Sequence, residues 1–175
     1  MALTSIVIVT HNQLAFTRQC VESIRERTAE PFEFVVVDNG STDATVEYLK
    51  TLGEAAAAGQ WSVDGDKGSG VNGQWSVASA EVSAPIPARR NDSPLSRITI
   101  LANHENRGFP AAANQGIRAA TGQQILLLNN DTIVTTGWLA RMLRALDGDP
   151  AIGLVGPCSN FVSVSGHSKP ARGRK

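Results

Sequence analysis

The chain has 175 residues, which is enough for one domain that buries its own hydrophobic core. Its 16 lysines and arginines balance 16 aspartates and glutamates, so the formal net charge is zero. Because proteins that bind nucleic acids present a basic face that neutralises phosphates, this balance argues against a nucleic-acid partner.

The first part of the chain alternates strands and helices. Residues 3–9 form a continuous β-branched, apolar run, which is typical of a strand buried on both faces of a parallel sheet. We expect Asn12 to cap a helix whose apolar residues recur at helical spacing as far as Ile24. A second strand, 32–37, leads through a polar loop into a helix that ends near Leu52. This order predicts right-handed crossovers between parallel strands.

The periodicity disappears between about residues 54 and 94. This stretch is rich in Ala, Gly, Ser and Asp, and it contains the segment GQWSV twice. A structureless stretch of this length is unusual inside a compact domain, so we expect a low-complexity surface insertion, with a hairpin as one option. Trp61 and Trp75 of the repeated segment belong either to a duplicated loop or to an aromatic platform for a ligand.

Regular elements return after the insertion. They are expected as a strand at 97–101, a helix at 110–120, a strand at 124–128, a helix at 137–146 and a short strand at 152–155. Together the elements predict a doubly wound α/β domain with a mainly parallel sheet over residues 1–160. A polar and basic tail, 161–175, is expected to follow it.

Polar clusters follow four of the expected strands, at 10–12, 38–43, 103–108 and 129–131. Asn, Gly, Ser, Thr and Asp form turns and helix caps, so each cluster alone has a structural explanation. Ligands of open parallel sheets, however, bind beyond the carboxyl ends of the strands. Because all four clusters project to that one edge, together they predict a ligand site.

Two acidic residues suggest the chemistry of this site. Asp38 ends an apolar strand, where its carboxylate can accept hydrogen bonds from a base N–H or a ribose hydroxyl. Asp131 follows another buried strand and suits Mg²⁺ or Mn²⁺ that takes its other ligands from phosphates and water. The absence of Gly-x-Gly-x-x-Gly after the first strand, of Gly-Lys-Ser/Thr and of Gly-x-Ser-x-Gly disfavours dinucleotide oxidoreductases, P-loop hydrolases and serine hydrolases.

The length of the apolar runs and the cysteines indicate the compartment. The longest aliphatic run, 125–128, is far below the roughly 20 residues of a membrane span, so we expect no transmembrane segment. Cys20 and Cys158 lack metal-ligand spacing and are typical of reduced thiols. We therefore expect a cytoplasmic protein. The basic residues at 169–175 are either a solvated tail or a contact with an anionic membrane at its inner face.

At these residues the sequence resembles the family-2 glycosyltransferases of GT-A fold, especially rhamnosyltransferase-like members. The matching blocks are IVIVTHN (6–12), VVVDNGSTDATVEYL (35–49), NRGFPAAANQGIRAATG (106–122), ILLLNNDTIVTTGWL (125–139) and IGLVGPCSN (152–160). They follow the family's order and cover nearly everything outside the insertion and the tail. The chain is thus similar to the N-terminal, donor-binding portion of such an enzyme, in the Rossmann-like fold of nucleotide-diphospho-sugar transferases.

The resemblance implies which residues hold a nucleoside-diphosphate sugar. The implied nucleotide-sugar-binding residues are Thr10, His11, Asn12, Asp38, Asn39, Gly40, Ser41, Asn106, Gly108, Asn114, Asn129 and Asn130. Residues 129–131 stand where the family has its D-x-D motif, so Asp131 would hold the divalent cation, Mn²⁺ or Mg²⁺, against the donor diphosphate. The implied donors are UDP- or dTDP-sugars.

The implied reaction is metal-dependent, inverting transfer of the sugar to a saccharide or other hydroxyl acceptor, as in cell-wall or polysaccharide biosynthesis. A carboxylate would deprotonate the acceptor. Asn129 replaces the first acid of D-x-D, and no carboxylate in 132–175 fits the base, because helix termination explains Asp147 and Asp149. Two hypotheses stay open: a transferase completed by a further chain or domain, and an inactive module that binds a nucleotide sugar or a partner protein. Under the first, Trp61 and Trp75 could contact an acceptor sugar.

Overall fold

The computed structural model describes residues 2–57, 82–85 and 95–157. The chain divides into two compact units, Met1–Ala140 and Arg141–Lys175, and the sheet belongs to the first. Cys158, the repeated GQWSV segments with Trp61 and Trp75, and the expected tail lie outside the described residues.

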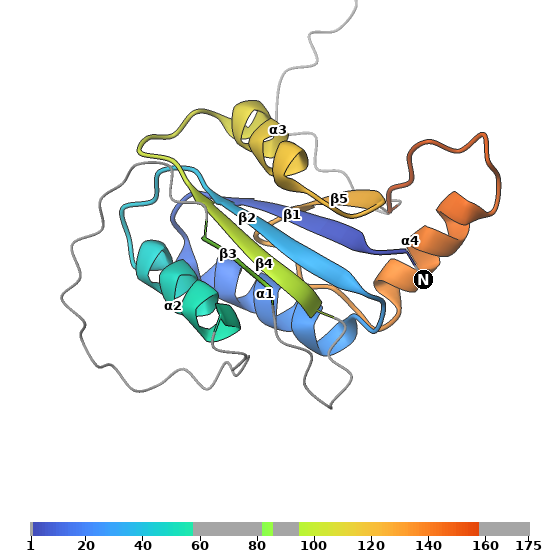
Figure 1. The fold of residues 1–175 in the computed structure, drawn as a ribbon, viewed down its shortest axis with the longest axis horizontal. Coiled ribbons are helices and arrows are strands. Elements are labelled where there is room, and N and C mark those ends of the chain that lie inside the picture. The colour runs from blue at the N-terminus through green and yellow to red at the C-terminus, as the bar shows by residue number, and fades with distance from the viewer. Residues whose placement is uncertain (1, 58–81, 86–94, 158–175) are drawn as a thin grey trace, which may run out of the picture. The chain divides into compact units, whose positions relative to one another are not determined.

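The first unit contains a five-stranded sheet in the order β3-β4-β2-β1-β5 (Figure 1). Its strands are β1 (Thr4–Thr10), β2 (Phe32–Asp38), β3 (Val82–Pro85), β4 (Leu95–Ala102) and β5 (Gln124–Asn129). The ladder from β4 through β2 and β1 to β5 is parallel, and β3 pairs antiparallel with β4. The predicted mainly parallel sheet is confirmed. The strand β3 lies within the stretch that the sequence marks as an insertion.

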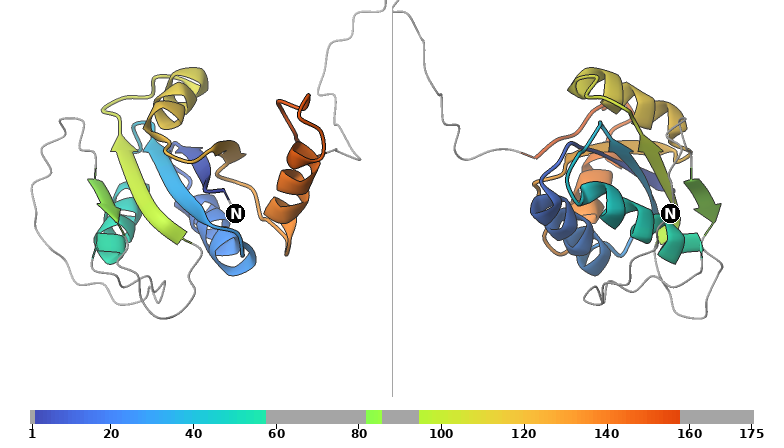
Figure 2. Two further views of the ribbon diagram at one scale, coloured as in Figure 1. Left: turned by 45° about the vertical axis from the view of Figure 1, so that its right-hand side comes forward. Right: turned by 90° about the vertical axis from the view of Figure 1, so that its left-hand side faces the viewer.

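Helices cover both faces of the sheet, as a doubly wound fold requires. The helices are α1 (Leu14–Arg27), α2 (Thr45–Ala57), α3 (Phe109–Ala119) and α4 (Trp138–Asp147). The two views of Figure 2 show α3 on one face of the sheet and α1 and α2 on the other. Gly116 allows α3 to approach β1 closely, since a Cβ at this position would collide with the side chain of Val7.

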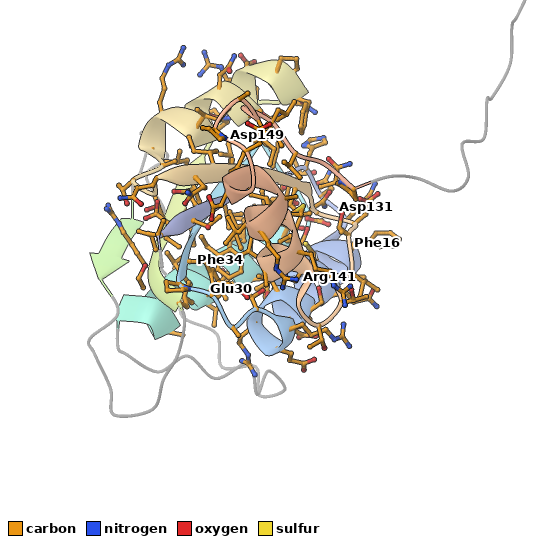
Figure 3. The ribbon with its side chains drawn as sticks, turned by 90° about the vertical axis from the view of Figure 1, so that its right-hand side faces the viewer. Phe16, Glu30, Phe34, Asp131, Arg141 and Asp149 are labelled. Carbon is orange, nitrogen blue, oxygen red and sulfur yellow. The ribbon has the colours of Figure 1, made fainter. Side chains whose placement is uncertain are left out.

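The main apolar core lies between the sheet and the pair α1 and α2. It includes Ile6, Ile8, Val21, Ile24, Phe32, Phe34, Val36 and Leu49, all at most 2% exposed. Phe32 and Phe34 meet edge to face with ring centroids 5.1 Å apart, and Figure 3 shows Phe34 in the interior. Full burial of such a side chain contributes about 1.5–3 kcal/mol to stability. This core fixes β1 and β2, whose ends carry the polar loops.

A buried glutamate joins the amino ends of β1 and β2 to the turn before β5. Glu33 is 1% exposed and accepts hydrogen bonds from Ser5 Oγ (2.5 Å), Thr121 N (2.6 Å) and Thr121 Oγ1 (2.8 Å). Ser5 Oγ in turn accepts the backbone N–H of Gly122 at 2.8 Å. Burial alone would raise the pKa of Glu33, but these hydrogen bonds outweigh it and hold the pKa below its ordinary value.

Most of the predicted elements are confirmed, and three expectations are wrong. The strand before Asp131 is not buried, since Ile125 and Leu127 of β5 are 46% and 48% exposed. Asn12 does not cap α1: the N-cap residue is Gln13, and the Asn12 side chain instead accepts the backbone N–H groups of Thr42 and Asp43. Residues 152–155 form no strand, because the described residues give them no neighbouring strand to pair with and Leu154 is 91% exposed. Helix α2 also continues past Leu52 to Ala57.

None of the helices in the described ranges combines the length and the apolar character that a bilayer crossing requires.

Candidate functional site

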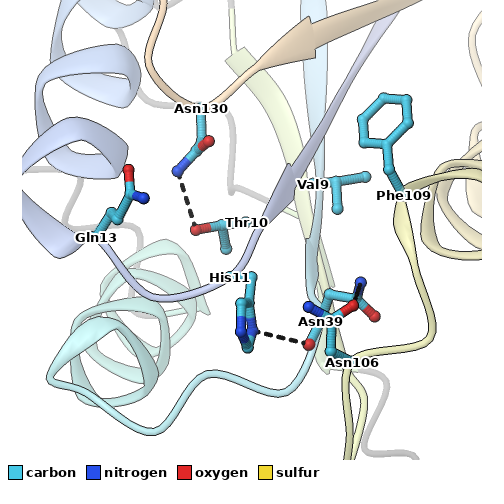
Figure 4. Close-up of a pocket in the computed structure, with 8 residues that line it drawn as sticks. All are labelled: Val9, Thr10, His11, Gln13, Asn39, Asn106, Phe109 and Asn130. Atoms are coloured by element: carbon cyan, nitrogen blue, oxygen red, sulfur yellow. Dashed lines mark hydrogen bonds between the residues drawn. The ribbon is translucent and has the colours of Figure 1, made fainter.

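A pocket of about 200 Å³ opens where β1, β2 and β5 end (Figure 4). Its lining residues are Val9, Thr10, His11, Gln13, Asn39, Asn106, Phe109 and Asn130. Five of them are residues that the sequence marks as binding residues: Thr10, His11, Asn39, Asn106 and Asn130. The fold thus brings together side chains from all four polar clusters, at the sheet edge where parallel α/β folds bind ligands.

Asn130 ties the end of β5 to β1 and α1. Its Nδ2 donates to Thr10 Oγ1 (3.3 Å) and to Thr17 Oγ1 (3.0 Å), and the two hydroxyls lie 2.8 Å apart. Both threonines are buried. Because both donors of the amide group are used inside the protein, the carbonyl oxygen of Asn130 is the atom that can accept a hydrogen bond from a ligand.

Asn39 is the centre of a network that joins the loops after β2 and β4. Its Oδ1 accepts Asn103 Nδ2 (3.1 Å) and Arg107 N (3.0 Å), and its Nδ2 donates to Asn106 Oδ1 (2.9 Å). Asn106 Oδ1 also accepts Gly108 N at 2.9 Å. Asn39 is only 2% exposed, so these bonds replace water that the amide loses on burial. We call this set the Asn39 network.

Two glycines allow the network to close. Gly40 has φ +82°, and a Cβ there would lie 2.6 Å from the backbone carbon of Glu105. The loop after β2 can therefore touch the loop after β4 only with glycine at this position. Gly108 has φ +79° and precedes α3 directly, so it turns the chain from the network into the helix.

Hydrogen bonds between the loops after β1 and β2 use Asn12, Ser41 and Asp43. Asn12 N donates to Ser41 Oγ (2.7 Å), and Asn12 Oδ1 accepts Thr42 N (2.7 Å). Asp43 accepts the backbone N–H of Thr45 at 2.9 Å at the start of α2. Hydrogen bonding from the side chain of Thr45, and to a smaller extent from backbone N–H groups, holds the pKa of Asp43 below its ordinary value. Asn12 and Ser41 support the loops around the pocket and do not line it.

Asp38 and His11 also make contacts inside the loops. Asp38 is 4% exposed, and its Oδ1 accepts Ser41 N at 3.0 Å. His11 Nδ1 lies 3.1 Å from the carbonyl oxygen of Asn39. Because a carbonyl oxygen only accepts, Nδ1 must donate, which leaves Nε2 of the neutral ring as an acceptor.

Asp131 follows β5 directly and is exposed, and Figure 3 shows it at the surface. Its carboxylate accepts no hydrogen bond from the residues that the structure describes. Those residues also contain no group of three or more His, Cys, Asp or Glu side chains placed to hold a metal ion. One free carboxylate fits a Mg²⁺ or Mn²⁺ ion that takes its remaining ligands from phosphate oxygens and water. It does not fit an ion held by the protein alone.

Cys20 contacts the end of β5, next to Asp131. Its thiol donates to the carbonyl oxygen of Asn129 at 3.5 Å. Burial, followed by the negative charge of Asp131, raises the pKa of the Cys20 thiol to about 11. The thiol is therefore protonated at neutral pH and acts as a small buried packing group.

Several of the predicted binding residues lie outside the pocket lining: Asn12, Asp38, Gly40, Ser41, Gly108, Asn114 and Asn129. Asn114 and Asn129 are exposed, on α3 and at the end of β5. Sequence reasoning did not identify Val9, Gln13, Thr17 and Phe109. The apolar periodicity of α1 assigns Thr17 to the core, and only the fold shows that its hydroxyl holds Asn130. Phe109 gave a weak signal, as a large apolar residue between a polar loop and a proline.

The family model of glycosyl transferase family 2 matches residues 5–62 and 88–174. Among curated relatives, the EpsH protein of Bacillus subtilis is 24% identical over 140 residues, which cover 80% of this chain and 29% of EpsH. Glycosyltransferase AglE of Haloferax volcanii is 22% identical over 174 residues, which cover 98% of this chain and 44% of AglE. The chain thus spans less than half of the length of these relatives.

Solved structures show the same fold. Mannosyltransferase PcManGT from Pyrobaculum calidifontis, in complex with GDP-Man and Mn²⁺, superposes with a TM-score of 0.57 at 21% identity over 86% of this chain. S. aureus TarS 1-349 superposes with a TM-score of 0.52 at 18% identity over 85% of this chain. The match covers 33% of each of those chains. The sheet and helices are therefore those of a GT-A fold, and with the family model matching most of its length, the chain belongs to glycosyl transferase family 2.

Proposed function

We propose that this chain holds the donor of a sugar transfer, a nucleoside-diphosphate sugar, at the carboxyl ends of its parallel strands. The observation that carries the proposal is the convergence of Thr10, His11, Asn39, Asn106 and Asn130 on one pocket. These side chains come from the ends of β1, β2, β4 and β5, which is where this fold class binds nucleotides. Family membership supports the same assignment. Two structural neighbours were solved with nucleotide sugars, UDP-GlcNAc for TarS and GDP-Man for PcManGT.

The residues divide into three groups by role. Thr10, His11 and Asn106 contact the nucleoside, and Asp38 accepts a hydrogen bond from the base through the oxygen that Ser41 leaves free. The supporting group holds the loops in place and consists of Asn12, Asn39, Gly40, Ser41 and Gly108. Asn114 faces the bound nucleotide from α3, and Asn129 and Asn130 face it from the end of β5.

Asp131 holds Mg²⁺ or Mn²⁺ against the donor diphosphate. The position just beyond β5 and the free carboxylate support this role, and the Mn²⁺ of PcManGT is consistent with it. When bound, the cation neutralises the charge that develops on the leaving phosphate. Asn130, the residue before Asp131, keeps this carboxylate in position, because its amide group is hydrogen-bonded to two buried hydroxyls.

We assign residues 1–160 to the donor-binding domain, interrupted by the insertion at about 54–94, and 161–175 to a tail. UDP- or dTDP-sugars are the proposed donors, and a saccharide or other hydroxyl compound is the proposed acceptor of an inverting transfer. A second candidate is donor binding without transfer, which one observation favours: none of the eight described residues that line the pocket is a carboxylate that could serve as base.

Isothermal titration calorimetry with UDP, dTDP and GDP, each with and without Mn²⁺, tests the proposal. We expect Mn²⁺ to tighten diphosphate binding in the wild-type chain. In Asp131→Ala this gain should disappear, with a loss of about tenfold or more, whereas the melting temperature should stay unchanged because the side chain is exposed.

Asp38→Ala provides the comparison for the nucleoside end of the site. It should weaken binding equally with and without Mn²⁺, since Asp38 is assigned to the base. If Asp131→Ala retains the full effect of Mn²⁺, Asp131 is not a metal ligand. If the wild-type chain binds none of the three nucleotides, the donor site itself is refuted.

A further inference from the structure

The pocket has one apolar wall and otherwise polar lining. Val9 and Phe109 are its apolar members, and the other six residues can all form hydrogen bonds. Phe109 is 52% exposed although it is one of the largest apolar side chains of the chain. In the view of Figure 4, its ring lies on the Val9 side of the pocket, away from Gln13. An apolar ring held half open to solvent costs hydration free energy that burial against a ligand would recover.

Phe109 contributes little to the fold. It is the first residue of α3, and it does not belong to the apolar core cluster or to the side chains packed against it. The buried face of α3 is formed by Ala112, Ala113 and Gly116. Packing against the sheet therefore does not explain why a large aromatic side chain occupies the first position of the helix.

The backbone just before Phe109 is held firmly in place. Arg107 N and Gly108 N donate to Asn39 Oδ1 and Asn106 Oδ1, at 3.0 and 2.9 Å. Both acceptors belong to the Asn39 network, in which Asn39 itself is buried. The ring is thus presented from a fixed backbone, which lowers the entropy cost of binding a ligand against it.

We propose that Phe109 forms the stacking wall for the nucleobase of the bound nucleotide. This inference rests on the proposed donor site. A nucleobase has a flat π face that stacks on an aromatic ring and a polar edge that forms hydrogen bonds, and the pocket offers one wall of each kind. A diphosphate has no apolar face and gains nothing from such a wall. The volume of about 200 Å³ also suits one part of the ligand, since pockets that enclose whole drug-sized ligands measure roughly 300–1,000 Å³.

Phe16 provides a matched control. It is 50% exposed, on the first turn of α1, and it does not line the pocket. The variants Phe109→Ala, Phe109→Leu, Phe109→Tyr and Phe16→Ala are compared by calorimetry with three probes: UMP, UDP with Mn²⁺, and inorganic pyrophosphate with Mn²⁺. Leucine keeps the apolar bulk and removes the ring, and tyrosine keeps the ring.

We expect Phe109→Ala and Phe109→Leu to weaken binding of UMP and UDP by about tenfold, the usual effect of losing one base-stacking ring. Phe109→Tyr should stay within about twofold of the wild type, and Phe16→Ala should be unchanged. Affinity for pyrophosphate should be the same in all variants, because this probe has no base. Unaltered UMP and UDP affinity in Phe109→Ala overturns the stacking role and leaves the donor site standing. An equal loss for pyrophosphate overturns it as well. A wild-type chain that binds neither nucleotide overturns the donor site and the stacking role together.

Discussion

Asparagine side chains position the loops of this pocket because one amide group both donates and accepts. Asn39 uses both functions at once: it accepts hydrogen bonds from Asn103 and Arg107, and it donates one to Asn106. An aspartate at this position could accept the hydrogen bonds from Asn103 and Arg107, but its carboxylate would repel Asn106 Oδ1. The sequence predicts these residues as turn formers and site residues. It could not predict their partners, which lie more than 60 positions away and meet only when β4 pairs with β2.

Gly40 offers the sharpest test of this loop contact. Gly40→Ala should lower the free energy of unfolding by about 1–3 kcal/mol more than Gly137→Ala, because only at Gly40 does the new Cβ meet backbone, at 2.6 Å from Glu105. Both glycines have positive φ, +82° and +71°, and nothing lies within 4 Å of a Cβ at Gly137. The comparison thus removes the cost of the backbone conformation itself. Urea denaturation measures the free energy of unfolding of both variants. Equal decreases would show that the loop after β4 moves aside without cost.

The secondary-structure elements follow closely from the apolar patterns of the sequence. The runs at β1 and β2 predict strands buried on both faces, and in the structure nearly every residue of both strands is buried. The prediction of a strand at 152–155 was wrong because a short apolar run forms a strand only where a partner strand is available. Glu33 shows another limit: its charge suggests a solvent-facing residue, yet the turn before β5 supplies the donors that make its burial stable.

Glu33 also makes the joint between β1, β2 and the turn before β5 sensitive to pH. Since its folded-state pKa lies below the ordinary value of 4.5, the ionised carboxylate stabilises the fold above that pH. This contribution is lost as the pH falls through the folded-state pKa. Glu33→Gln should therefore cost about 1.5–3 kcal/mol at pH 7, the usual value of hydrogen bonds to a charged group. The difference from the wild type should shrink at acidic pH.

Urea denaturation at pH 7 and at pH 3.5 measures both effects. Glu26→Gln is the control, because Glu26 is an exposed glutamate of α1 and should change stability little at either pH. A constant difference between Glu33→Gln and the wild type at the two pH values would show that the charge of Glu33 does not contribute.

For the molecule as a whole, the order of the elements decides which polar clusters meet. Strands distant in sequence become neighbours in the order β4-β2-β1-β5, so four separate clusters arrive at one sheet edge. The rule that parallel strands direct their carboxyl ends to one edge was enough to predict this from the sequence. Which residues line the pocket was not predictable, because it depends on which side chains form hydrogen bonds within the loops and are then not available to a ligand. Asn12 and Ser41 bond to each other's loops, and Phe109 remains exposed.

The kinds of side chain that line the pocket lead to a prediction about activity. Six of the eight described residues that line the pocket can form hydrogen bonds to the proposed nucleotide, but none of the eight is a carboxylate. A general base typically contributes a factor of about 10²–10⁴ to the rate. The aligned region is also only 33% of each solved neighbour. We therefore expect the 175-residue chain to bind UDP with Mn²⁺ and to release little or no UDP from UDP-sugars when saccharide acceptors are added.

A coupled assay for released UDP, run with several UDP-sugars and with and without acceptor, measures this activity. Asp131→Ala serves as the control, because any true transfer should depend on the proposed metal ligand, whereas contaminating hydrolysis should not. Robust release that requires both the acceptor and Asp131 would contradict the prediction. It would place the base among residues of this chain that do not line the pocket. Binding without such release would identify the chain as the donor-holding part of the reaction.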